Sequence, residues 1–267
     1  MAFDINTFVI NKIVRGTAFS HKGNMLYTIN QIQNASLSCT SESADAVDAM
    51  GTPITTFYRA KTAELSAENA LFDLSLLAAQ SGSAKTVASE TTKIVCPAFD
   101  SIIVEADKTE YELKHTPMAG AEPTEIFVLK GDSTFGEKYV KGTAASDTEF
   151  ALSGKTLQIP TGLAAGVELC VIYDYESTAA VEVVNSATEF PSSCKFVMEV
   201  LGCEACNPDE MIYAYIIFPN AKLSPDFDWS IQTDGAHPFT MRAQQAYCDK
   251  EKKLFSIVIP SDEDENA

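Results

Sequence analysis

Few residues in this sequence have the type and spacing that chemistry requires, and Cys203 and Cys206 are the clearest pair. A C-x-x-C motif can supply half of a four-ligand zinc site or the redox pair of a thioredoxin-like protein. No second C-x-x-C and no H-x₃-H motif accompanies it, and the Asn-Pro-Asp sequence at 207–209 indicates a turn rather than a helix start. The pattern therefore favours a turn with two incidental thiols, and a metal site or a redox pair remains as the alternative.

The histidines and paired aspartates give equally little support for catalysis. His237 lies in a Gly- and Pro-containing stretch, and His115 precedes Thr-Pro, so both are predicted to be solvent-facing loop residues; His21 falls in a predicted turn. Asp226 and Asp228 could form a carboxylate pair, but a solvated or lumen-lining strand face is the simpler interpretation. Signature motifs of serine hydrolases, zinc proteases, P-loop proteins and dinucleotide-binding proteins are missing. We expect no catalytic, cofactor-binding or metal-binding residue and no enzyme activity.

Composition restricts the partners. The chain of 267 residues has 37 Asp and Glu against 19 Lys and Arg, a formal net charge of −18. Such a surface repels phosphate, which argues against tight nucleic-acid binding. No stretch approaches the roughly 18 apolar residues of a membrane span, and the first residues lack the features of a signal peptide. We therefore expect synthesis in a cytoplasm and no membrane partner.

Most predicted elements are strands. Runs of β-branched, aromatic and aliphatic residues between Gly, Asp, Ser and Pro clusters indicate them. The predicted strands are 7–10, 24–29, 36–40, 94–95, 102–104, 126–129, 157–159, 169–173, 194–201, 211–218 and 254–259. Hairpin turns are predicted at 21–24 and 153–156, where Gly tolerates the positive φ of such turns.

Three further patterns concern the C-terminal third. The runs 194–201 and 211–218 are dense in apolar residues, as is typical of strands covered on both faces. Alternation of Phe227, Trp229 and Ile231 with polar residues predicts a strand with one acidic face. Residues 262–265 are all acidic and predict a short disordered tail.

One helix is predicted, over about 66–80. Ser66 is a suitable N-cap, Leu71, Leu74 and Leu77 recur at helical spacing, and Gly82 supplies a stop. These leucines should form the inward face. Phe72 and Leu76 lie off that face and should meet an inserted domain or an adjacent subunit.

The segment 49–72, which begins AMGTPITTFYRAK, resembles the tail tube (major tail) proteins of long-tailed bacteriophages. The sequence FPNAKL at 218–223, the turn at 233–235 and the closing strand at 255–260 resemble the same family. The resemblance covers roughly 8–105 and 181–260. It implies a mainly β fold, a β-sandwich or half-barrel with one flanking α-helix. Residues 1–105 and 181–267 would form the tube core, and 106–180 an inserted small β domain on the outer surface.

The resemblance also implies a function in the virion. Six subunits would form a ring whose inner sheets join into a barrel, and rings would stack into a tail tube that conducts DNA during ejection. Partners would include a sheath or tail terminator, a baseplate or tip, and a tape measure protein in the lumen, with assembly in the host cytoplasm. An acidic chain fits a lumen that DNA passes without binding. The alternatives are a capsid decoration protein, a cell-surface β-sandwich binding module and an enzyme without a recognised motif.

Overall fold

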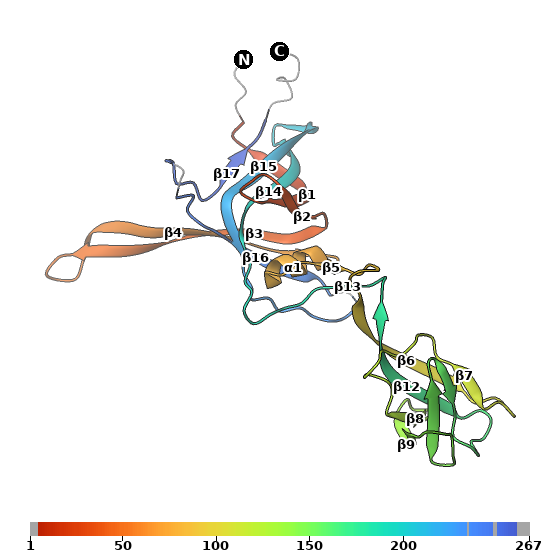
Figure 1. The fold of residues 1–267 in the computed structure, drawn as a ribbon. Helices are drawn as coiled ribbons and strands as arrows, with labels where there is room; N and C mark the ends of the chain where they lie inside the picture. The colour runs from red at the N-terminus through yellow and green to blue at the C-terminus, as the bar shows by residue number, and fades with distance from the viewer. Residues whose placement is uncertain (1–4, 234, 248–249, 261–267) are drawn as a thin grey trace. The chain divides into compact units, whose positions relative to one another are not determined.

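The computed structural model describes residues 5–233, 235–247 and 250–260, and its chain divides into two compact units. The first unit combines Met1–Lys85 with Val183–Ala267, and the second is Thr86–Glu182. Figure 1 follows the chain from the first unit into the second and back. Each unit has its own sheet and its own hydrophobic core.

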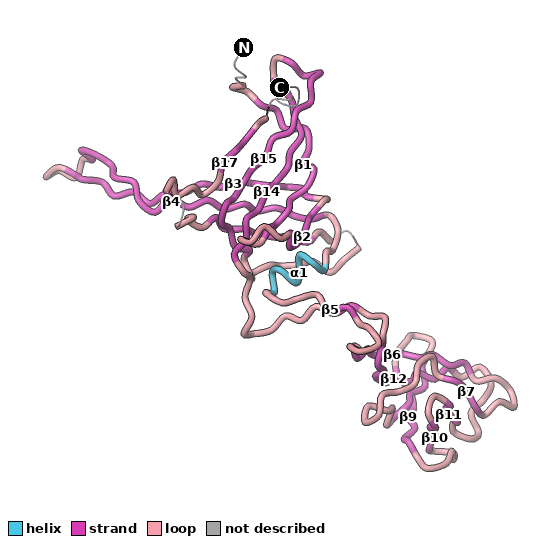
Figure 2. The backbone as a smooth tube through the Cα atoms, turned by 45° about the horizontal axis from the view of Figure 1, so that its top comes forward, coloured by secondary structure: helices cyan, strands magenta, loops and turns pink. Residues whose placement is uncertain are grey.

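The first unit contains an eight-stranded sheet that curls into a half-barrel, as Figures 1 and 2 show. Its strands are β1 (Phe8–Phe19), β2 (Met25–Ile29), β3 (Ile32–Val47), β4 (Pro53–Asn69), β14 (Ser193–Glu204), β15 (Asn207–Leu223), β16 (His237–Ala243) and β17 (Ser256–Val258). Their order is β2-β1-β14-β15-β16-β4-β3, with β17 beside β15, and the pairings are antiparallel. The mainly β half-barrel predicted from the sequence is confirmed.

The core of this unit fills the concave side of the sheet because alternate residues of each strand point inward. In β14 the buried residues are every second one, from Cys194 through Phe196 and Met198 to Val200. Within the single chain, only one face of the runs 194–201 and 211–218 is buried. Their opposite face carries half-buried and exposed apolar side chains, including Tyr213 and Met211.

The helix is shorter than predicted. Helix α1 spans Leu74–Ser81, whereas residues 66–69 belong to β4 and pair with both β3 and β16. Asp73, not Ser66, is the N-cap: its carboxylate accepts hydrogen bonds from the backbone N–H groups of Ser75 (2.7 Å) and Leu76 (3.0 Å). Gly82 is the C-cap, as predicted, with φ 72°. A Cβ there would lie 2.3 Å from backbone of residue 190, so only glycine fits.

The inward face of α1 also differs from the prediction. Leu76 is fully buried in the core, whereas Leu71 and Leu74 are exposed. Phe72 precedes the helix and stacks on Trp229, with ring centroids 4.1 Å apart and planes 6° from parallel. Residues 226–232 are not a strand either, since they form an irregular segment in which Phe227 and Trp229 are half-buried. The predicted tail at 262–265 lies outside the described residues.

The second unit holds a seven-stranded sheet around a separate core. Its strands are β6 (Ile94–Ile103), β7 (Glu110–Glu112), β8 (Glu125–Leu129), β9 (Phe135–Lys141), β10 (Glu149–Ser153), β11 (Thr156–Gln158) and β12 (Glu168–Ser177). The order is β6-β12-β8-β9-β10-β11-β7, and β9 and β10 are parallel to each other. Two short strands, β5 (Thr86–Val87) and β13 (Val181–Glu182), pair where the chain enters and leaves the unit. The predicted turn at 153–156 joins β10 to β11.

The boundary of the second unit lies earlier in the chain than the expected residue 106. Strand β6 pairs with β12 over its whole length, from Ile94 opposite Ser177 to Ile103 opposite Glu168. The expected strands at 94–95 and 102–104 are thus one strand of the second unit. The spacing of apolar residues could not reveal its partner, which follows some seventy residues later in the sequence.

Candidate assembly surfaces

The distal halves of β3 and β4 form a two-stranded arm that projects from the sheet of the first unit (Figures 1 and 2). We define the arm as residues 38–62. Every residue in it is exposed except Ala44, which is half-buried. In contrast, the proximal part of β4 buries Ala63, Leu65 and Ala67 in alternation. The arm therefore has no core of its own.

Local hydrogen bonds fix the turn at the tip of the arm. The Asp48 carboxylate accepts from the backbone N–H groups of Met50 (2.9 Å) and Thr52 (2.8 Å), and Gly51 adopts φ 84°. The Asp48 N–H donates to the Thr52 carbonyl at 2.9 Å. This arrangement leaves the Met50 side chain pointing into solvent, 91% exposed.

Apolar side chains cover both faces of the arm. Tyr58 lies on one face and Phe57 on the other, Ile54 lies at a bulge near the tip, and all three side chains are more than half exposed. An isolated two-stranded hairpin is marginally stable in water, and exposed apolar clusters usually mark interaction sites. The arm thus has the properties of a segment that becomes covered by another molecule.

The edges of the curled sheet are a second assembly surface. Among the described residues, β2 and β3 are each hydrogen-bonded to one neighbour only and end the sheet. The first half of β15, residues 207–214, likewise pairs with β14 alone. Unpaired strand edges are templates for strands of another chain unless a protein protects them.

The convex face of the sheet carries an ion pair among apolar residues. Arg15 on β1 donates from Nε to the Glu199 carboxylate on β14 at 2.5 Å, and that contact raises the pKa of Arg15. Val197 and Tyr215 lie beside this pair and line a shallow hollow with it. The face is therefore neither strongly acidic nor uniformly apolar.

The structure does not bring the predicted chemical residues together. Cys203 lies near the end of β14, and Cys206 lies in the short turn at 205–206 that leads to β15. The turn predicted at 207–209 is misplaced, because these residues already belong to β15. Within the described part of the chain, no group of three or more His, Cys, Asp or Glu side chains could hold a metal ion. Asp226 and Asp228 are exposed on the irregular segment.

The prediction of a solvent-facing His237 is wrong, because this residue is fully buried on β16. Its Nδ1 accepts from the Asp73 N–H (3.4 Å), so Nε2 carries the proton and donates to Gln80 Oε1 (2.7 Å). Gln80 in turn donates to the Pro238 carbonyl at 2.9 Å. Burial lowers the pKa of His237, and the Asp73 carboxylate opposes part of that effect. The exposed His115 fits its prediction and stacks on Tyr175.

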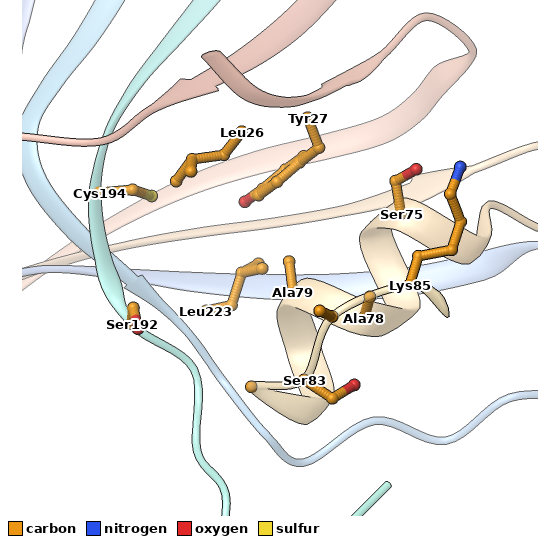
Figure 3. Close-up of a pocket in the computed structure, with 12 residues that line it drawn as sticks. Leu26, Tyr27, Ser75, Ala78, Ala79, Ser83, Lys85, Ser192, Cys194 and Leu223 are labelled. Carbon is orange, nitrogen blue, oxygen red and sulfur yellow. The ribbon is translucent and has the colours of Figure 1, made fainter. Parts of the chain in front are cut away.

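A pocket beside α1 is the feature that the sequence did not reveal. It has a volume of about 420 Å³ and lies between the helix, the edge strand β2 and the start of β14 (Figure 3). Its lining comes from four segments that are distant in the sequence, the fourth being Leu223 on β15, so no local motif could have indicated it. The arm, in contrast, could be noticed in the sequence, because it contains the AMGTPITTFYRAK segment that resembles tail tube proteins.

Two comparisons with known proteins bear on these surfaces. Residues 8–255 match the sequence profile of the YomU/Tube protein family. A search of curated proteins found no match. Among the described residues, no helix is long and apolar enough to cross a membrane.

Proposed function

Because this chain belongs to the YomU/Tube protein family, a phage-related family of tube proteins, we propose that it is the tail tube subunit of a long-tailed phage. In this proposal six copies form a ring, rings stack into a tube, and DNA passes through the lumen during ejection. The chain acts as a structural component of the virion and not as an enzyme.

The observation that carries the proposal is the arm. A segment exposed on both faces, with apolar residues on each, gains stability only when a neighbour covers it. The arm projects from the sheet, so that another subunit can contact it (Figure 1). Stacked rings offer such a neighbour to every arm.

The open sheet edges support ring formation. Pairing of an edge strand with the next subunit would satisfy its free N–H and C=O groups. Repetition of one heterologous contact closes a ring when the rotation between neighbours divides a full turn. The curl of the sheet favours such closure, since each subunit already supplies an arc.

The net charge of −18 fits the passage of DNA. An acidic lumen repels phosphate and prevents the polymer from adhering to the wall. Other tail components, such as a sheath or terminator, a tip complex and a tape measure protein, would bind the outside, the ends and the lumen. Assembly would take place in the host cytoplasm.

Electron microscopy of the purified chain tests the proposal. We expect hollow rods with sixfold symmetry in cross-section, whereas a capsid decoration protein would stay dispersed without capsids. Replacement of residues 42–59 by Asn-Gly removes all but the base of the arm and should leave folded subunits or rings that do not stack. A stable monomer at high concentration, a ring of another order, or rods formed without the arm would contradict the proposal.

A further inference from the structure

The pocket beside α1 combines an apolar wall with polar groups that lack partners. Leu26, Ala78, Ala79 and Leu223 supply the apolar part (Figure 3). The volume of about 420 Å³ falls within the range of about 300 to 1,000 Å³ found for ligand pockets. A side chain with its adjoining backbone turn would fit this space.

The polar groups of the pocket define what its occupant must offer. The hydroxyls of Tyr27 and Ser83 are buried and form no hydrogen bond to a nitrogen or oxygen atom of the described structure, and the only polar group beside the Tyr27 hydroxyl that affects it is the weakly hydrogen-bonding Cys194 thiol. Tyr27 is 6% exposed, and its hydroxyl points toward Ala79 and Leu223 in Figure 3. Burial, and secondarily the neighbouring Cys194 thiol, raises the pKa of Tyr27 well above its ordinary value, so the hydroxyl is a donor. An unpaired buried hydroxyl is costly, and an occupant with acceptor oxygens would remove that cost.

A third property of the pocket is the positive charge of Lys85, which an occupant should complement. Lys85 lines the pocket, is exposed, and forms no ion pair within the described residues. The pocket therefore suits an occupant with an apolar end, free carbonyl groups and a negative charge close by.

The tip of the arm meets these three requirements. Met50 is a flexible apolar side chain, which adapts to irregular cavities. The carbonyls at 49–51 accept no hydrogen bond in the described structure. Residues 43–58 contain Asp45 and Asp48 but no Lys or Arg, so the tip is complementary to Lys85.

We propose that the pocket beside α1 binds the Met50 tip of the arm from a second copy of this chain. Within one chain, the arm leads away from α1 in both views, so the tip must reach the pocket of another copy (Figures 1 and 2). Such a contact joins different surfaces on the two partners, and repetition extends it without closing a dimer. The inference rests on the proposed function and names the surface that receives the arm.

Site-directed cross-linking tests the contact. Cys39 and Cys206, the exposed cysteines among the described residues, are first changed to Ser, and so is Cys248. One preparation then carries Met50→Cys and a second carries Ser192→Cys at the exposed rim of the pocket. After mixing and mild oxidation, we expect a disulfide-linked 50–192 peptide in the mass spectrum. Asp209→Cys, at an exposed position near the start of β15, replaces Met50→Cys as the control and should give no such product.

Charge reversal supplies an independent readout. Met50→Lys should lower rod yield about tenfold or more, because a second cation would face Lys85 in an apolar site. Adding Lys85→Glu should restore rods, whereas Ile231→Lys, at another exposed apolar residue, should leave them unchanged.

The outcomes separate this inference from the function on which it rests. If the unsubstituted chain forms rods but Met50→Lys does so equally well and no 50–192 link appears, the pocket has another occupant and the tube function stands. If no rods form in any preparation, the tube function fails. The cross-link then decides the contact alone, and its absence overturns the inference.

Discussion

His237 and Tyr27 are both buried polar side chains on the first unit, yet only one of them is satisfied. Both ring nitrogens of His237 have partners, and its neutral form fits them. The Tyr27 hydroxyl has no nitrogen or oxygen partner within the described residues. Satisfied groups fix a structure, while unsatisfied ones reduce its stability until a partner arrives. The two residues therefore predict different experimental signatures.

His237 predicts a pH-dependent stability. Its pKa in the folded state is lowered, so the unfolded chain binds the proton more readily. The free energy of unfolding should be constant above the ordinary histidine pKa of 6.5 and decrease as the pH falls below it. Urea titrations between about pH 7.5 and 5 would measure the change, about 1.4 kcal/mol for each unit of the shift. His21 and His115 are exposed, so replacing both with Gln should preserve the pH dependence; its disappearance would contradict this assignment.

A matched pair of Tyr→Phe substitutions tests the unpaired hydroxyl. Tyr27→Phe should leave the free energy of unfolding of the isolated subunit unchanged or slightly raised, but should weaken assembly. Tyr173→Phe, in the second unit, removes a 2.8 Å hydrogen bond to the buried Asp100 carboxylate and should cost about 1–3 kcal/mol. Thermal unfolding and rod yield measure the two effects. A loss of subunit stability in Tyr27→Phe would show that its hydroxyl is already paired within the chain.

Helix α1 shows how pairing overrides local propensity. Residues 66–69 have a sequence suited to a helix N-terminus, yet their backbone groups pair with the strands on both sides of β4. Alternation over Ala63, Leu65 and Ala67 is the strand signal, and it competes with the leucine spacing that begins at Leu71. Two ladders of hydrogen bonds and a buried face outweigh the small differences in intrinsic helix propensity.

The helix prediction can be tested with two leucines that differ in burial. Leu76 is fully buried, so Leu76→Ala should cost about 2–5 kcal/mol through lost contacts and a cavity. Leu74 is 37% exposed, and Leu74→Ala should cost less than about 1 kcal/mol. Urea denaturation of the unassembled subunit measures both. Equal losses would mean that the helix is rotated relative to the arrangement described.

The chain consists of two units, and the second is inserted into the sequence of the first. Strands β5 and β13 pair, with Val87 opposite Val181, so the two chain crossings between the units lie side by side. The second unit has a sheet and core of its own. Because the two crossings are adjacent, the second unit can be removed and the chain rejoined without disturbing the fold of the first unit.

Deletion of residues 86–182, with Lys85 joined to Val183 through Gly-Ser-Gly, should therefore leave a folded subunit that still forms rods. Residues 86–182 expressed alone should unfold in a single cooperative transition. Circular dichroism and electron microscopy are the measurements. As a control, deletion of 107–178 removes all of β12 and leaves β6 without its partner, so this variant should aggregate. Loss of rods in the soluble 86–182 deletion would place the second unit in the tube wall.

The sequence by itself determined the mainly β character, the turns at 21–24 and 153–156, the Gly82 stop and the resemblance to tube proteins, because each depends on nearby residues. Only the tertiary structure decided that β6 joins β12, that His237 is buried, and that the pocket beside α1 forms. These features arise from pairing and packing between segments far apart in the chain, and local periodicity carries no record of the partner. The arm lies between the two cases. Its residues are visible in the sequence, but their exposure follows from the tertiary structure, because no other strand among the described residues lies beside them.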